Sequence, residues 1–399
     1  MVVNSAQAVA DRYADFAWQQ ARGESDAHEE LTARISQDPD FCDFLAVSLP
    51  HGNQQQPNLL LAAVRYLDGP HAEQGPRGDF AYRSWREWTI RHWDDVRDVM
   101  MQRLARTDEP ARCATLLPVL ARLPQPLALL EVGAAAGLCL HPDRYRYRYD
   151  GGPEFGDPDS PVVLPCRTSP GTPVPAAPPR IVWRAGLGLD PLDLSDPDDI
   201  RWLRALAWPG PRDDTALGAS AGTGTGDAWP GGTGNGGGTG YDGGTRDSGD
   251  TGNGGRTGNG RRTGNGGVSV ADPAGRQLAA VEAVRNAPPV PLVRGDLLHE
   301  LPALAAQAPP EATLVVFHTA ALTHLPPKRR EEFVRVVRSL LVDRPGHWVS
   351  QEHHSVLPWL PGPRPADARL LTLAVDGRPV ALTEQHGRSV QWLAEPEPM

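Results

Sequence analysis

The sequence predicts an α/β protein: a mostly parallel β-sheet with helices on both faces, preceded by an N-terminal helical domain. From Val9 to about Leu123, apolar residues recur at spacings of three and four, the pattern of amphipathic helices. Leu127 to Val132 is a continuous apolar run with one acid, typical of a strand buried on both faces of a parallel sheet. Later apolar runs alternate with helical patterns, which favours strands joined by helical crossovers.

Composition divides the chain into four parts. We predict an N-terminal helical domain or lid over residues 1–123, the first part of the sheet domain over 124–208, an insertion over 209–272 and the second part of the sheet domain over 273–399. The insertion is rich in Gly, Thr, Asn, Asp and Ser, with repeated Thr-Gly-Asn-Gly-Gly units. Such a segment cannot bury enough apolar surface to offset its conformational entropy, so we expect a disordered surface loop without a catalytic role.

The overall composition narrows the function. With 399 residues, of which 40% are hydrophobic, the chain can bury a substantial core. A net charge of −10 argues against a protein that grips nucleic acid through phosphate contacts. No segment has the pattern of a signal peptide or the length of a membrane span, and the four cysteines form no C-x-x-C pair. We expect a cytoplasmic protein with a small-molecule partner, without nucleic acid, membrane or bound metal.

The residues after the first strand predict a ligand-binding turn. Glu131 stands near the end of the strand, and Gly133 and Gly137 follow with only alanines between them. Glycines let a backbone turn approach a ligand closely, and the first amides of a following helix can face that ligand. We therefore expect a strand, a tight turn and the start of a helix. Ala135 replaces the middle glycine of the dinucleotide-binding G-x-G-x-x-G motif, and a turn that merely packs is the alternative.

Further acids and histidines stand at the ends of other predicted strands. Alternating tyrosine and arginine over 144–149 predicts a strand, and Asp150 follows it where nucleotide-binding folds place an acid for ribose hydroxyls. Because parallel strands open their carboxyl ends on one edge, we expect a single crevice. Its predicted lining comprises Glu131, the turn Gly133 to Gly137, Asp150, Asp296, His318 and Glu352.

The remaining segments complete the expected fold. Thr107 or Asp108 is expected to cap a helix that ends near Leu123, and residues 153–180, rich in proline, are expected to be irregular. Residues 180–184 predict a short strand, and residues 198–206, 274–285 and 328–341 predict helices. Residues 369–374 and 389–393 are expected to pair as a terminal hairpin through Asp376 and Gly377.

Two resemblances sharpen this interpretation. The stretch from Glu131 to Gly137 resembles the first motif of S-adenosylmethionine-dependent methyltransferases. The whole chain outside the insertion resembles the bacterial domain of unknown function 2332, through the segments 56–63, 129–138, 143–145, 156–161, 203–209, 293–296 and 315–318. That family resembles a Rossmann-like methyltransferase-type fold. This chain departs from the family pattern at Ala135, at Cys139 and at Asp108, where serine, asparagine and asparagine are usual.

Our first hypothesis is an S-adenosylmethionine-dependent methyltransferase acting on a small molecule. Gly133, Ala135 and Gly137 would hold the methionine part beside Glu131, Asp150 the ribose and Asp296 the adenine amine. His318 is either a base, because its ordinary pKa lies near working pH, or a structural histidine. We expect Asn58 and Arg112 of the front domain to help shape the acceptor pocket.

Two other functions remain open. The first is a non-catalytic nucleotide- or metabolite-binding protein on the same fold, since a fold does not imply a function. The second is a metal-dependent hydrolase that uses His318, Glu352, His353 and His354. Neighbouring residues on a strand face opposite sides, so we expect at most one of the two adjacent histidines to face a site.

Overall fold

The computed structural model describes residues 5–70, 78–106, 108–209, 273–285, 287–361, 365, 367 and 369–393. Contacts between Cα atoms group the chain into one unit, Met1–Arg212 with Val268–Met399, and a second unit, Asp213–Gly267. The second unit lies outside the described residues, as do Thr107 and the predicted insertion beyond Pro209.

The N-terminal segment is helical, as predicted. Its elements are α1 (Ala6–Phe16), the π-turn η1 (Ala17–Ala21), α2 (Asp26–Ser36), α3 (Pro39–Ser48), the 3₁₀ turn η2 (Asn53–Gln55), α4 (Pro57–Tyr66), α5 (Gly78–Arg91) and α6 (Trp93–Gln102). The side chains of Ser5, Ser25 and Asp38 accept hydrogen bonds from the first turns of α1, α2 and α3. Trp85 is buried, and Trp88 and Trp93 pack partly buried against the same core, so these tryptophans form core rather than a stacking surface. Trp18 and Phe80 are exposed.

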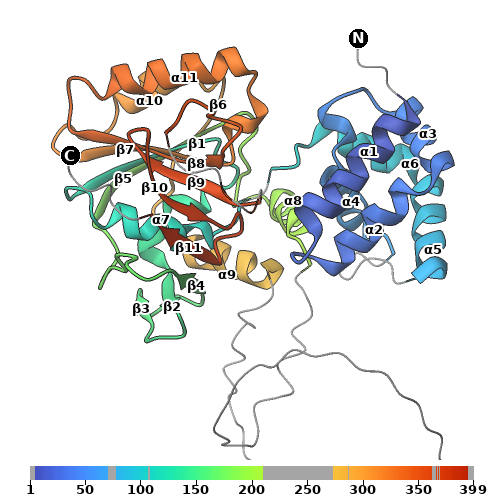
Figure 1. Cartoon of the computed structure of the whole chain (residues 1–399), viewed down its shortest axis with the longest axis horizontal. Helices are drawn as coiled ribbons and strands as arrows, with labels where there is room; N and C mark the ends of the chain where they lie inside the picture. The colour runs from blue at the N-terminus through green and yellow to red at the C-terminus, as the bar shows by residue number, and fades with distance from the viewer. Residues whose placement is uncertain are drawn as a thin grey trace, which may run out of the picture. The chain divides into compact units, whose positions relative to one another are not determined.

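The rest of the unit is built on one sheet (Figure 1). Its strands are β1 (Leu127–Val132), β2 (Arg146–Tyr149), β3 (Phe155–Gly156), β4 (Val163–Thr168), β5 (Ile181–Gly188), β6 (Leu292–Arg294), β7 (Thr313–Thr319), β8 (Gly346–His353), β9 (Leu371–Val375), β10 (Arg378–Thr383) and β11 (Ser389–Trp392). They lie in the order β3-β2-β4-β11-β10-β9-β8-β7-β1-β5-β6. The strands from β6 to β8 are parallel, and β8 to β11 form an antiparallel run.

Helices cover both faces of the sheet, as predicted. The helices α10 (Leu301–Ala305) and α11 (Pro327–Leu340) pack on one face, in a core cluster with Leu130 and Val316. The helix α7 (Arg112–Leu120) belongs to the core of the other face, and the Tyr149 hydroxyl donates to the Ala114 carbonyl at 2.6 Å. Thus α7, which the sequence assigned to the N-terminal domain, packs on the sheet. The remaining helices are α8 (Pro197–Leu206) and α9 (Pro273–Arg285).

The predicted helix after the glycine turn is wrong. Two short 3₁₀ turns follow instead, η3 (Leu138–Leu140) and η4 (Pro142–Arg144). Gly137 has a φ of 72°, so the backbone turns left-handed where a helix would begin, and Pro142 lacks the N–H that a continuing helix needs. The predicted cap of α7 is wrong as well, because that helix begins after Ala111 and Asp108 binds elsewhere.

Three further expectations need correction. Residues 153–180 contain β3 and β4, which β2 and β11 hold by backbone pairing despite the prolines. The short strand expected over 180–184 continues to Gly188 because it pairs with β1 along its length. The terminal hairpin joins β9 to β10 through Asp376 and Gly377, and β11 then pairs with β10. For β4 and β5, pairing with a strand distant in sequence outweighed the local composition.

Candidate functional site

The glycine turn lies at the point where the sheet order reverses. From β1 the ordered neighbours on one side are β5 and then β6, and on the other side β7 and then β8. Ligands of open α/β sheets bind at such a switch point, outside the carboxyl ends of the strands. The N–H groups of Gly133 and Ala134 donate to the Leu187 carbonyl at the end of β5, at 2.7 and 3.1 Å. The turn also touches the loop after β7, since a Cβ on Gly133 would lie 2.4 Å from that of Ala321.

A buried carboxylate accepts hydrogen bonds from the end of the glycine turn. Oδ2 of Asp108 accepts from the N–H groups of Ala136 at 2.8 Å and Leu138 at 3.0 Å. Burial raises the pKa of Asp108, while these two N–H groups oppose the shift. Asp108 of the chain itself therefore occupies two amides of the segment that we expected to face a ligand.

Glu131 is buried in β1 on the same side. Its side chain is 5% exposed, and its Oε2 has no hydrogen-bond partner among the described residues. Burial raises the pKa of Glu131 well above its ordinary value, the Asp108 charge adds to this rise, and the Arg112 guanidinium opposes it. A carboxyl group in these surroundings favours the protonated form.

This environment predicts that Glu131→Gln stabilises the fold, and that the gain in stability depends on pH. A carboxyl whose pKa is higher in the folded than in the unfolded protein stabilises the fold below its unfolded pKa and loses that contribution as the pH rises. The uncharged amide has no such loss, so we expect the variant to melt above the wild type at pH 8 and to differ less at pH 5. Thermal melts at both pH values measure this. An equal difference at the two pH values would show that Glu131 does not titrate differently on folding.

Acids follow both strands beyond β1. Asp190 comes two residues after β5, the strand that lies beside β1 in the sheet. Its carboxylate pairs with Arg294 at the end of β6. Burial lowers the pKa of Arg106, and the Asp190 carboxylate opposes this shift, so a second guanidinium lies near the same acid. Asp296 follows β6, accepts from the Leu298 and His299 N–H groups at 3.0 and 3.2 Å, and pairs with Arg329 at 2.7 Å.

Asp150 does not lie beside the turn. The strands β4, β11, β10, β9, β8 and β7 separate its strand β2 from β1. Its carboxylate binds the N–H and hydroxyl of Thr168 in a tight turn, where Asp150 has a φ of 51°. The expectation that Asp150 joins the crevice is therefore wrong, and Asp190 holds the strand-end position instead. The sequence signal that could have identified Asp190 was the strand ahead of it. The acidic run and the proline that begin at Asp190 obscured where that strand ended.

His318 is enclosed within the sheet and α11. It is fully buried, its Nδ1 lies 2.7 Å from Oε1 of Glu352, and its Nε2 accepts from the Trp348 indole N–H at 3.0 Å. The same Glu352 oxygen accepts from the N–H groups of Ala321 and Leu322, both at 2.9 Å. Neither ring nitrogen is free to take a proton from a ligand, so His318 has the arrangement of a structural histidine that braces the loop after β7.

The two expected acceptor-pocket residues have different surroundings. Arg112 donates from Nε to the Gln385 carbonyl at 3.0 Å and from Nη1 to the Thr319 hydroxyl at 3.2 Å, inside the protein. Asn58 lies half-buried in the first turn of α4. Its neighbours Gln56 and Leu59 line a cavity of about 20 Å³ together with Arg106 and His324. Burial and the charge of Arg106 lower the pKa of His324.

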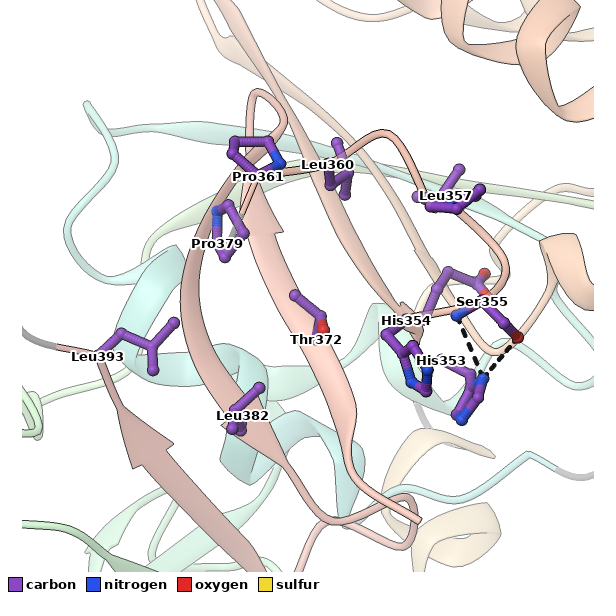
Figure 2. A pocket seen from close by; sticks show the side chains of 12 residues that line it. His353, His354, Ser355, Leu357, Leu360, Pro361, Thr372, Pro379, Leu382 and Leu393 are labelled. Atoms are coloured by element: carbon purple, nitrogen blue, oxygen red, sulfur yellow. Dashed lines mark hydrogen bonds between the residues drawn. The ribbon is translucent and has the colours of Figure 1, made fainter. Parts of the chain in front are cut away.

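A larger cavity lies beyond the end of β8 (Figure 2). Its volume is about 400 Å³, and its lining includes Glu352, His353, His354, Thr372 and Leu382. The strand β8 ends at His353, so His354 no longer alternates with it. The expectation that the two histidines face opposite sides is wrong, because their rings lie 4.1 Å apart.

The described residues bring three possible metal ligands together elsewhere. Atoms of Glu24, Glu384 and His386 lie within 4.8 Å of one another. Arg388 pairs with both glutamates there. Burial and the Glu384 charge raise the pKa of Glu24 to about 7, against the opposing charge of Arg388. The cluster therefore already contains a cation, which would repel a metal ion.

Comparison with known proteins places the chain in a family. Among the described residues, no helix combines the length and apolarity that a membrane crossing requires. No curated protein and no solved structure matches the sequence. A family model matches residues 10–217 and 274–392, which together form most of the chain. The chain thus belongs to the family described as an uncharacterized protein conserved in bacteria, DUF2332.

Proposed function

We propose that the chain is a methyltransferase-like protein that binds S-adenosylmethionine at the carboxyl edge of β6-β5-β1-β7 and acts on a small molecule. The observation that carries this proposal is the glycine turn at the switch point, beside which lie β5 and β6, the strands that Asp190 and Asp296 follow by two residues. Doubly wound nucleotide-binding folds use this arrangement, with phosphate or amino-acid groups at the turn and ribose at the acid of the adjacent strand.

The residues present fit parts of the cofactor. Within the described chain, the N–H groups of Ala135 and Gly137 have no hydrogen-bond partner, which leaves donors for the methionine carboxylate. Asp190 would accept from the ribose hydroxyls and Asp296 from the adenine amine, each in exchange for an arginine partner. When bound, the cofactor supplies a methyl group on a sulfonium, and this chain's residues have only to align an acceptor with it.

A small cavity next to the segment 103–106 bears on this proposal. The cavity beside Arg106 and His324, about 20 Å³, has room for little more than a water molecule. The segment 103–106 follows α6 and lines that cavity. A nucleoside is far larger than this cavity, so it would fit here only if the segment 103–106 moved aside.

The second candidate is a non-catalytic binding protein on the same fold. The observation that favours it is the enclosure of His318, whose two nitrogens both have partners. The occupation of two turn amides by Asp108 points the same way, because a second carboxylate there meets a like charge.

Calorimetry with two matched variants tests the proposal. We expect S-adenosylmethionine and S-adenosylhomocysteine to bind the wild type, Asp190→Asn to weaken binding by about tenfold or more, the cost of about one charged hydrogen bond, and Asp150→Asn to leave it unchanged. Asparagine tolerates the left-handed backbone of residue 150, so this control keeps its turn.

The outcomes separate the candidates. Folded wild-type protein that binds neither compound would contradict the methyltransferase-like proposal. Loss of binding in Asp150→Asn alone would restore Asp150 as the ribose acid and reject Asp190. Tight binding without methyl transfer to any compound of a small-molecule acceptor panel would favour the non-catalytic candidate.

A further inference from the structure

The cavity beyond β8 has an apolar wall and a polar end. Leu357 and Leu360 of the loop after β8 lie along one side of it, Leu382 and Leu393 along another, and His353 and Ser355 at one end (Figure 2). Its volume of about 400 Å³ is within the range of small-molecule sites, which are mostly apolar with a few placed polar groups.

Glu352 supplies the polar group on the floor of this cavity. Strand register pairs Glu352 with Thr372 and Thr372 with Leu382, so the three side chains stand in a row on one face of the sheet. All three line the cavity. The Glu352 side chain is 2% exposed.

The two oxygens of Glu352 differ. Oε1 accepts from His318 Nδ1 and from the N–H groups of Ala321 and Leu322. Oε2 is buried and has no partner among the described residues. A buried acceptor without a donor is costly, so a ligand that brings a donor to Oε2 gains more than the hydrogen bond alone would give in water.

The surroundings favour a cationic donor. No lysine or arginine is among the described residues that line the cavity. Charge-assisted hydrogen bonds to a carboxylate are about twice as strong as neutral ones.

We propose that this cavity is a binding site for a small amine, whose ammonium group donates to Oε2 of Glu352 while its apolar body packs against the leucines and prolines of the wall. The site is separate from the glycine turn and does not depend on nucleoside binding there. Glu352 nevertheless joins the two places, since its other oxygen holds the loop that carries Ala321 against Gly133.

Binding of simple amines to the full chain, without nucleoside, tests the site. Benzylamine and cyclohexylmethylamine are titrated by ligand-observed NMR and calorimetry, with benzyl alcohol and cyclohexylmethanol as neutral partners of the same shape. We expect saturable amine binding and alcohol binding weaker by about tenfold or more.

Three variants assign the binding to Glu352 and the cavity. Glu352→Gln keeps one oxygen for the three N–H donors and replaces the free oxygen by a donor, so it should abolish amine binding. Leu382→Phe fills the cavity with Glu352 intact, and should also abolish it if the glutamine variant fails to fold. Glu332→Gln removes an exposed carboxylate of α11 and should change nothing.

The proposal is overturned if neither amine binds the folded wild type. It is equally overturned if the alcohols bind as well as the amines, or if folded Glu352→Gln or Leu382→Phe retains wild-type affinity. Because no nucleoside is present, these outcomes are independent of whether S-adenosylmethionine binds.

Discussion

Gly133→Ala should lower the free energy of unfolding by about 2–5 kcal/mol, as the sum of a backbone and a packing cost. Gly133 has a φ of 87°, a region that residues with a Cβ rarely occupy. The added Cβ would also lie 2.4 Å from the Cβ of Ala321, far inside van der Waals contact. Urea denaturation of wild type and variant measures the loss.

Gly151→Ala is the matched control. Gly151 has a φ of 71°, and an added Cβ would meet nothing within 4 Å. The Gly151→Ala variant should therefore lose only the backbone contribution to the free energy of unfolding, about 1–2 kcal/mol. In the double variant Gly133→Ala with Ala321→Gly, the clashing methyl is gone, so we expect part of the packing loss to return as a coupling energy.

Equal losses for the two glycine variants would contradict this account. They would mean that the loop after β7 yields to the extra methyl group, and that the two strand ends are not held in fixed contact. The proposed site depends on the close approach of the glycine turn to this loop, and that approach would then not be rigid.

His318→Phe should lower the free energy of unfolding by about 2–4 kcal/mol, because two buried groups lose the ring nitrogens that they bond. The Trp348 indole N–H loses its acceptor, and Oε1 of Glu352 loses one of three donors. Both groups remain buried, so water cannot replace the lost bonds. Thermal and urea unfolding measure the change.

His347→Phe is the control for this prediction. His347 stands on the neighbouring strand β8 and makes the same kind of bond, with Nδ1 2.7 Å from a carboxylate oxygen of Asp376. Its side chain is 28% exposed, so the pair is worth at most about 1 kcal/mol. If His318→Phe instead keeps wild-type stability and loses methyl transfer at unchanged cofactor affinity, His318 is a base after all.

The sequence was sufficient for the local elements. The strand Leu127–Val132 was predicted with its observed bounds, and so was the mostly helical nature of the segment before it. The tight turn at Gly133 was predicted as well. These features follow from apolar periodicity and from glycine's backbone freedom, which are properties of neighbouring residues.

Only the tertiary structure decided which strand lies beside β1. Strand order depends on pairing between segments far apart in the chain, and local patterns carry little information about it. The segments before Asp150 and before Asp190 both had the pattern of strands. Of these two strands only β5, the one before Asp190, pairs with β1, so Asp190 and not Asp150 lies next to the turn. The partners of Asp108, His318 and Glu352 were hidden for the same reason: each comes from a distant segment, and the buried bond that defines its role forms only when the chain folds.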